Sequence, residues 1–230
     1  MAKNTYVLLW LEGVFQAWGS SSRFSIKDSQ NFPTKSGVLG LVLSAMGRNG
    51  EQVELLSKLS TTEMRVVAFS KTETPQAKLM DYQTIGGGYS RKNGFENLCI
   101  PKDVNGKNTD FDTSILHKAY LQDVVFAVVL EVPDDIKNEL IDGLLCPVYQ
   151  SFLGRKNCIP TEFIYQGKFD ELDDAVFHAL DMAKQKNFYH RFSVIEGVHS
   201  NNMSKVLTLC DVPKNFGRIK SYGMRTVTII

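Results

Sequence analysis

The sequence lacks any long hydrophobic run, and its start, Met1 to Tyr6, lacks the basic-then-apolar order of a signal peptide. A helix that crosses a membrane needs about 20 consecutive apolar residues. These absences argue against a membrane span and against a membrane partner. With a hydrophobic content of 43%, the chain is expected to be a folded cytoplasmic protein.

Metal-binding and cofactor-binding patterns are also missing. The four cysteines, Cys99, Cys146, Cys158 and Cys210, include no Cys-x-x-Cys pair, and the four histidines show no His-x-x-x-His spacing. We expect reduced thiols, with Cys146 and Cys210 buried because they lie in apolar runs. The sequence therefore predicts neither a metal nor a cofactor.

Motifs of hydrolytic enzymes are absent as well. Thr34-Lys35-Ser36 lacks the glycines of a nucleotide-binding loop, and no Gly-x-Ser-x-Gly is present. His117 and Lys118, with a tyrosine such as Tyr120 or Tyr82, could serve as base and cation in metal-independent RNA cleavage. The alternative is that His117 and Lys118 contact only an RNA phosphate or solvent, and this alternative is favoured.

An excess of one charge is missing too, since 26 Lys and Arg stand against 25 Asp and Glu. The distribution is uneven, however. Acidic residues gather at two expected helix starts, where they complement the helix dipole. Residues 212–230 carry Lys214, Arg218, Lys220 and Arg225 with no acid. A nearly neutral protein can therefore still carry a basic groove.

Hydrophobic periodicity predicts an α+β protein. The almost continuously apolar segment Thr5 to Gly13 is typical of a central strand that is covered on both faces. Pro33 and Thr34 signal the start of a buried helix that ends at Gly47. The expected helices are 36–46, 134–145 and 172–186, and the expected strands are 5–13, 64–70, 124–132, 192–196, 205–210 and 226–230.

The order of the first elements suits a ferredoxin-like β-α-β-β-α-β domain over residues 1–146, followed by a smaller domain over 147–230. A polar insertion, Ser90 to Ser114, interrupts the first domain and contains Asn-Gly pairs at 93–94 and 105–106 that favour tight turns. We expect it to form a thumb within residues 84–117, although a solvated loop is the simpler alternative.

Several motifs occur in the same order as in a known family. They begin with Leu11-Glu12-Gly13-x-x-Gln16-x-Trp18-Gly19, then Arg23-Phe24, then Pro33-Thr34-Lys35-Ser36-Gly37-Val38-Leu39-Gly40-Leu41. Further along the chain come Asp81-Tyr82-Gln83-Thr84, Lys118-x-Tyr120-Leu121-x-Asp123, Gly154-Arg155-Lys156-x-Cys158-Ile159-Pro160-Thr161 and Arg218-x-x-x-Tyr222-x-x-Arg225. This series resembles the CasD family, the fifth Cas protein of type I-E Cascade. Gln83, Lys118 and Lys156 replace a His and two Arg of the family pattern.

The resemblance implies a ferredoxin-like (RRM-like) domain with a thumb β-hairpin and a smaller β-rich C-terminal domain. It implies a non-catalytic subunit that binds and caps the 5′ handle of CRISPR RNA and docks against the large subunit and the backbone subunits of Cascade. Target DNA would be contacted indirectly, through the complex. A related branch of the family cleaves precursor RNA, so the endoribonuclease alternative through His117, Lys118 and Tyr120 stays open.

The RNA contacts follow from the matched motifs and from residue chemistry. Lys35 and Ser36 are expected to form a phosphate seat at the helix start, beside Arg23, although an ordinary helix cap is the alternative. Trp18, Tyr82 and Tyr120 are candidates for stacking on unpaired bases, and Trp10 is assigned to the core. Arg155, Lys156 and Arg225 would contact phosphates. The full predicted set is Gln16, Trp18, Gly19, Arg23, Lys35, Ser36, Tyr82, Lys118, Tyr120, Gly154, Arg155, Lys156 and Arg225.

Overall fold

A computed structural model describes residues 5–19, 25–74, 76–103, 105–108, 113–199 and 204–230. The strands are β1 (Thr5–Glu12), β2 (Phe15–Gln16), β3 (Ile26–Lys27), β4 (Met64–Ser70), β5 (Leu79–Gly86), β6 (Thr113–Gln122), β7 (Val124–Val132), β8 (Tyr165–Phe169), β9 (Tyr189–Glu196), β10 (Lys205–Asn215) and β11 (Ser221–Ile229). The helices are α1 (Lys35–Ala45), α2 (Val53–Ser60), α3 (Gly94–Cys99), α4 (Lys137–Leu145) and α5 (Leu172–Gln185).

A seven-stranded antiparallel sheet in the order β10-β11-β9-β4-β7-β1-β8 organises the molecule. The alternation of side chains along β1 sends Leu9 and Leu11 into one hydrophobic core and Leu8 and Trp10 into another. The strand is thus covered on both faces, as its continuous apolar sequence predicted, and Trp10 is fully buried.

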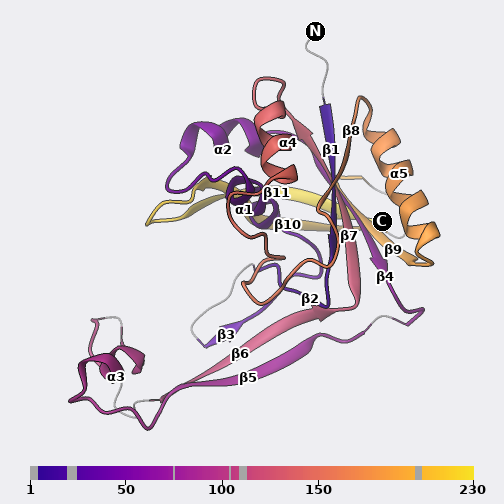
Figure 1. The fold of residues 1–230 in the computed structure, drawn as a ribbon. Helices are drawn as coiled ribbons and strands as arrows, with labels where there is room; N and C mark the ends of the chain where they lie inside the picture. The colour runs from indigo at the N-terminus through magenta and orange to yellow at the C-terminus, as the bar shows by residue number, and fades with distance from the viewer. Residues whose placement is uncertain (1–4, 20–24, 75, 104, 109–112, 200–203) are drawn as a thin grey trace.

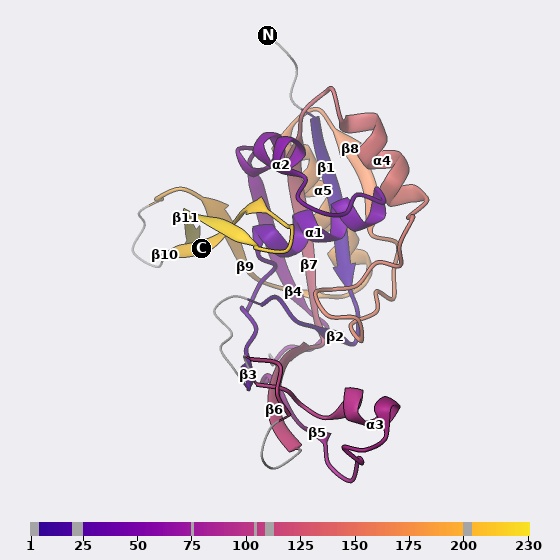
Figure 2. The same cartoon turned by 90° about the vertical axis from the view of Figure 1, so that its left-hand side faces the viewer.

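More helices cover one face of the seven-stranded sheet than the other. Residues of α1, α2 and α4 pack into the core on one face, and α5 packs on the other, as Figure 2 shows with α5 behind the sheet. The α5 helix contributes Ala175, Ala179 and Ala183, which lie four residues apart on one side of the helix and let it approach the sheet closely. This layering leaves the outer surface of α1 free to line a groove.

The sheet does not divide at residue 146. Strand β8 pairs with β1, and β9 pairs with β4, so segments from both sides of the expected boundary build one sheet. Within it, β8-β1-β7-β4 are neighbours, with α1 between β1 and β4 along the chain and α4 between β7 and β8. The fourth strand of this β-α-β-β-α-β set therefore comes from beyond residue 146, and the division into two domains stays a prediction.

A long hairpin leaves the body of the molecule (Figures 1 and 2). Strands β5 and β6 pair from Leu79↔Tyr120 to Gly86↔Thr113, and the short helix α3 lies near the tip. β6 also pairs with β2 and β3, so the hairpin is anchored in a second, four-stranded sheet. The prediction of a tight turn at 93–94 is wrong, because the Asn93 side chain instead caps the start of α3.

The sequence located most of the sheet. The limits of β4 and β7 were predicted to the residue. Helices α4 and α5 fall within their expected ranges, and α1 begins and ends one residue earlier than expected. Helix α2 and strand β8 were not predicted, and β9, β10 and β11 are longer than expected. In the described part of the chain, no helix has the length and apolarity to cross a membrane.

Candidate functional site

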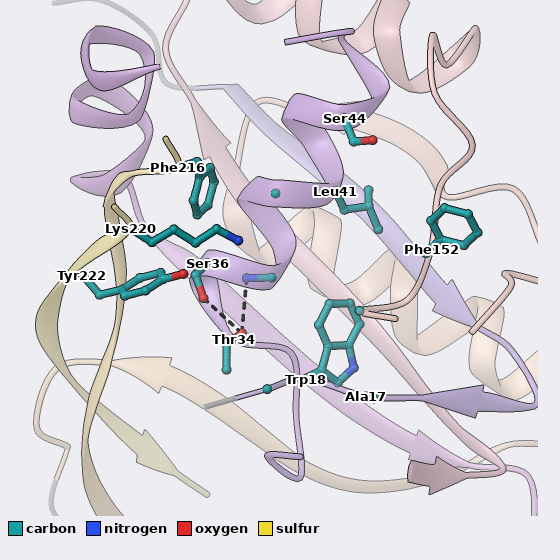
Figure 3. Close-up of a pocket in the computed structure, with 14 residues that line it drawn as sticks. Ala17, Trp18, Thr34, Ser36, Leu41, Ser44, Phe152, Phe216, Lys220 and Tyr222 are labelled. Carbon is teal, nitrogen blue, oxygen red and sulfur yellow. Dashed lines mark hydrogen bonds between the residues drawn. The ribbon is translucent and has the colours of Figure 1, made fainter. Parts of the chain in front are cut away.

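A groove of about 480 Å³ lies on the outer surface of α1. Figure 3 shows α1 as its back wall, with Phe216, Lys220 and Tyr222 of the β10–β11 hairpin on one side and Phe152 on the other. Its lining residues are Ala17, Trp18, Gly19, Thr34, Ser36, Gly37, Gly40, Leu41, Ser44, Phe152, Gly154, Phe216, Lys220 and Tyr222. Four of these, Trp18, Gly19, Ser36 and Gly154, belong to the predicted RNA-binding set.

The start of α1 is stabilised locally. Thr34 is the N-cap, and its Oγ1 accepts a hydrogen bond from the Gly37 amide at 3.2 Å. Ser36 Oγ donates to the same oxygen at 3.4 Å, and both bonds are drawn in Figure 3. The ordinary helix cap that the sequence allowed is therefore present, and the hydroxyl of Ser36 lies at the groove.

Lys35 does not form the predicted phosphate seat. Its side chain is only 2% exposed, and its Nζ donates to the Thr62 carbonyl and to Glu196 Oε1, the latter at 3.0 Å. Its own amide donates to Asp211 Oδ2 at 2.8 Å, so the helix start already holds a carboxylate. Burial lowers the pKa of Lys35, and the charge of Glu196 offsets part of that effect.

Arg225 belongs to the same network of buried charged side chains, so its guanidinium is not free to contact an RNA phosphate as predicted. Its guanidinium binds both oxygens of Asp211, at 2.7 and 2.9 Å, and Glu196 at 3.0 Å. Asp211 is 4% exposed, and both of its carboxylate oxygens accept hydrogen bonds from within the protein. Its buried charge is therefore compensated. A lone aspartate in the otherwise apolar run around Asp211 was the sequence signal for this network.

The cation that faces the groove is Lys220, which the predicted set omitted. Figure 3 shows its ammonium directed toward the first turn of α1, with the Tyr222 hydroxyl close to Ser36. In the described segments no carboxylate pairs with Lys220. An unpaired ammonium beside two hydroxyls can bind an anion such as a phosphate. The acid-free stretch of residues 212–230 was the available signal.

Gln16 and Trp18 are structural. Gln16 is fully buried; its amide nitrogen donates to the carbonyls of Leu11 and Val124, and its amide oxygen accepts from Trp18 Nε1. Trp18 is 1% exposed, which excludes the predicted stacking of a base on its face. A Cβ added at Gly37 would approach Trp18 to 2.8 Å, so the helix packs directly on the indole. Gly19 is exposed at the groove.

The turn at Gly154 to Lys156 closes one side of the groove. Gly154 has φ +95°, and a Cβ there would lie 1.8 Å from the Ala17 carbonyl oxygen, so only glycine fits. Arg155 donates to the carbonyls of Ala119 and Lys27, at 2.9 and 2.7 Å, and its guanidinium lies 4.7 Å from the centre of the Tyr120 ring. Its role here is to join β3, β6 and the turn, whereas Lys156 is exposed.

The remaining predicted residues lie on or beside the β5–β6 hairpin. Tyr120 is 3% exposed, and its hydroxyl accepts from Asn157, so it is not a free stacking platform. Tyr82 is 59% exposed, and its ring packs edge-on against His117 at 5.4 Å. Lys118 Nζ donates to Gln83 at 2.6 Å. Tyr82 is thus the accessible aromatic of the predicted three.

His117, Lys118 and Tyr120 do not converge on one point. His117 and Lys118 are successive residues of β6, so their side chains leave opposite faces of the strand. The Tyr120 hydroxyl is directed to Asn157. Arg23 lies outside the described residues. Of the predicted residues that the structure describes, four line the groove, Arg155 and Lys156 lie in the turn beside it, and the others lie on the hairpin or in the interior.

Two further sequence predictions can be compared with the structure. Cys146 and Cys210 are exposed, contrary to expectation, whereas Cys158 is buried. Cys146 follows the last turn of α4, and Cys210 lies on the outward side of β10, so neither apolar run faces the core at that position. Over the described ranges, no three His, Cys, Asp or Glu side chains form a group that could hold a metal ion.

Known structures share this fold. One is a chain of a structure described as "CRISPR RNA-guided surveillance complex", with a TM-score of 0.72 at 23% identity over 98% of this chain and 89% of that one. Another, described as "Crystal structure of Cas protein", gives a TM-score of 0.57 at 19% identity over 98% of this chain and 93% of that one. At these identities the likeness establishes the fold alone.

Sequence comparison establishes the family. The model of the family described as "CRISPR-associated protein (Cas_Cas5)" matches residues 6–228, so the chain belongs to this family of CRISPR-associated proteins. A relative in Escherichia coli (strain K12), "CRISPR system Cascade subunit CasD", is 27% identical over 172 residues, which cover 71% of this chain and 71% of that protein.

Proposed function

We propose that this protein is a non-catalytic subunit of a type I-E-like Cascade complex that binds and caps the 5′ handle of CRISPR RNA. Family membership and the likeness to CasD, a Cascade subunit, support the assembly. The groove on α1 supports the RNA contact and carries the proposal, because Lys220, Ser36 and Tyr222 line it together and no acidic residue is in the described lining. RNA phosphates are the anions that such a groove fits.

The fold class is part of the same proposal. The neighbouring antiparallel strands β8-β1-β7-β4, with α1 and α4 on one face, support a ferredoxin-like (RRM-like) core. Its sheet is extended by β9, β11 and β10, and the β10–β11 hairpin brings Lys220 to the groove. Target DNA would reach the protein only through the complex, because the guide reads the target by base pairing.

The β5–β6 hairpin is the proposed thumb, laid against RNA and the neighbouring large or backbone subunit. A two-stranded hairpin is marginally stable by itself. This one carries exposed apolar side chains near its tip, with Phe95 78% and Leu98 73% exposed. Such side chains favour a covered state in the assembled complex.

The test is binding of a 5′-labelled single-stranded RNA taken from the CRISPR repeat of the genome that encodes the protein. Lys220→Met should weaken binding and reduce the slope of log K against log salt by about 0.7, the share of one phosphate contact on a single strand. Lys184→Met, an exposed lysine of α5 on the other face of the sheet, removes the same charge and should change neither. Equal effects of the two substitutions would refute a local contact at the groove.

The second candidate, a metal-independent endoribonuclease, is tested with the same RNA in EDTA. We expect the RNA to be bound and left intact, because His117, Lys118 and Tyr120 do not converge. Cleavage that disappears in His117→Ala would overturn the non-catalytic assignment.

A further inference from the structure

The groove on α1 continues past the first hollow. A second hollow of about 260 Å³ shares Gly40, Ser44 and Phe216 with it and extends to Arg48 and Tyr149. Because Gly40 and Ser44 lie one turn apart on α1, the two hollows form one groove along the helix. The Phe216 ring stands between them as a shared wall.

The charge of the groove changes along its length. Among the described lining residues, neither of the two hollows contains an aspartate or a glutamate. Lys220 lies at one end and Arg48 at the other, where Arg48 is paired with Glu139 but remains 47% exposed. The next hollow beyond Arg48 is lined by the carboxylates of Glu51, Glu54 and Glu139 and by the cations of Arg48 and Lys58, so acidic side chains outnumber basic ones there. A polyanion would therefore be favoured along α1, where no carboxylate lines the groove, over the hollow beyond its end.

Among the described residues, nothing requires position 40, at the centre of the groove, to be glycine. It lies inside α1 without a positive φ, and a Cβ there would meet its nearest neighbour, Phe216 Cζ, at an ordinary 4.0 Å. Glycine is less favourable than alanine inside a helix. Gly37 differs, because the indole of Trp18 occupies its Cβ position. The absent side chain at Gly40 leaves the helix backbone open to a molecule from outside.

Aromatic rings line both hollows and give them the chemistry of base binding. Phe152 and Phe216 border the first, and Tyr149, 48% exposed, and Phe216 border the second. Unpaired bases stack on such rings irrespective of sequence. Cations at the ends, aromatic walls and a floor without side chains at Gly40 together favour single-stranded RNA over an apolar protein segment.

We propose that α1 is the floor of an RNA track in which two successive nucleotides place their bases in the hollows on either side of Phe216, while the sugar-phosphate backbone passes over Gly40. This inference rests on the proposed RNA-binding function and adds to it the path of the strand. It also makes Gly40 a positioning residue, since its lack of a side chain sets how closely the backbone approaches the helix.

The experiment separates fold stability from RNA binding with Gly40→Ala and a matched control. Ser57→Ala, at an exposed position of α2 outside the groove, offers a smaller gain in helix propensity of the same sign. Both variants should unfold at a higher urea concentration than the wild-type chain. Only Gly40→Ala should weaken binding of the repeat-derived RNA, by about tenfold, the order expected for one clashing methyl group. Gly40→Met should weaken it further.

A second readout locates the strand. The same RNA, with 4-thiouridine at successive positions and irradiated on the wild-type chain, should crosslink at two adjacent positions to peptides that contain Phe216 or Tyr149. If wild-type protein does not bind the RNA, the proposed function fails. If it binds and Gly40→Ala binds equally well, the track alone is overturned. If Gly40→Ala leaves RNA binding intact but prevents co-purification with another subunit, the groove holds protein, which also overturns the track.

Discussion

Lys35 is the first residue of α1, and Lys220 faces the same end of that helix across the groove. Replacing Lys35 by methionine should lower stability but not RNA binding, whereas replacing Lys220 should lower RNA binding but not stability. Methionine keeps an unbranched apolar stem, so Lys35→Met removes chiefly the ammonium. The Thr62 carbonyl then loses its donor, which costs about 1–3 kcal/mol for a buried group. Glu196 keeps Arg225 at 3.0 Å, and the desolvation cost of the ammonium disappears. We expect a net loss of about 1–2 kcal/mol in the free energy of unfolding.

Lys220 is exposed and has no carboxylate partner in the described part of the chain. Lys220→Met should therefore change the free energy of unfolding by no more than about 0.5 kcal/mol. Lys35→Glu would place a third carboxylate beside Glu196 and Asp211 with Arg225 alone to balance them, so it should cost at least about 3 kcal/mol.

Urea denaturation followed by circular dichroism measures these differences, and the salt dependence of RNA binding is measured on the same preparations. Lys35→Met should leave the salt slope unchanged, whereas Lys220→Met should lower it by about 0.7. The reasoning is refuted if Lys35→Met lowers the slope without loss of stability, because its ammonium would then face RNA and not the interior.

Three further predictions concern other parts of the molecule. Gly154→Ala should destabilise the protein by about 2 kcal/mol or more in urea denaturation, because alanine is strained at φ +95° and its Cβ would overlap the Ala17 carbonyl. Gly19→Ala, whose Cβ would have no atom of the described residues within 4 Å, should be neutral, and equal stability of the two variants would contradict the turn geometry. Burial alone would raise the pKa of Glu12, but hydrogen bonds from Lys71, Trp10 and Lys186 outweigh it and lower the pKa below its ordinary 4.5. The stability that Glu12 contributes is therefore present above pH 4.5 and is lost as the pH falls through the lowered pKa. Denaturation curves should show that Glu12→Gln loses less stability than wild type in that pH window. Identical losses of stability would count against the assignment. Limited proteolysis should cut the β5–β6 hairpin near α3 in the free protein and not in the assembled complex, and equal cutting in both states would argue against the thumb.

Local patterns predicted the elements well where one interaction dominates. Strand β7 is a run of apolar residues, and α1 has the Thr34 cap and the Gly47 stop, so both can be recognised from local sequence alone. Strand β8, Tyr-Gln-Gly-Lys-Phe, has no such pattern and exists because the edge of β1 is available to pair with it. Helix α2 was missed for a related reason, since only Leu56 and Leu59 mark its buried side.

The candidate site could be predicted from the sequence only in part. The sequence alone determined the family, the position of α1 and the basic character of residues 212–230. Only the tertiary structure decided which cation faces the groove. Lys35 and Lys220 have the same chemistry, but carboxylates 161 and 176 residues along the chain from Lys35 draw it inside. No nearby residue encodes that burial, because the sheet creates it when β9, β10 and β11 close over the start of α1.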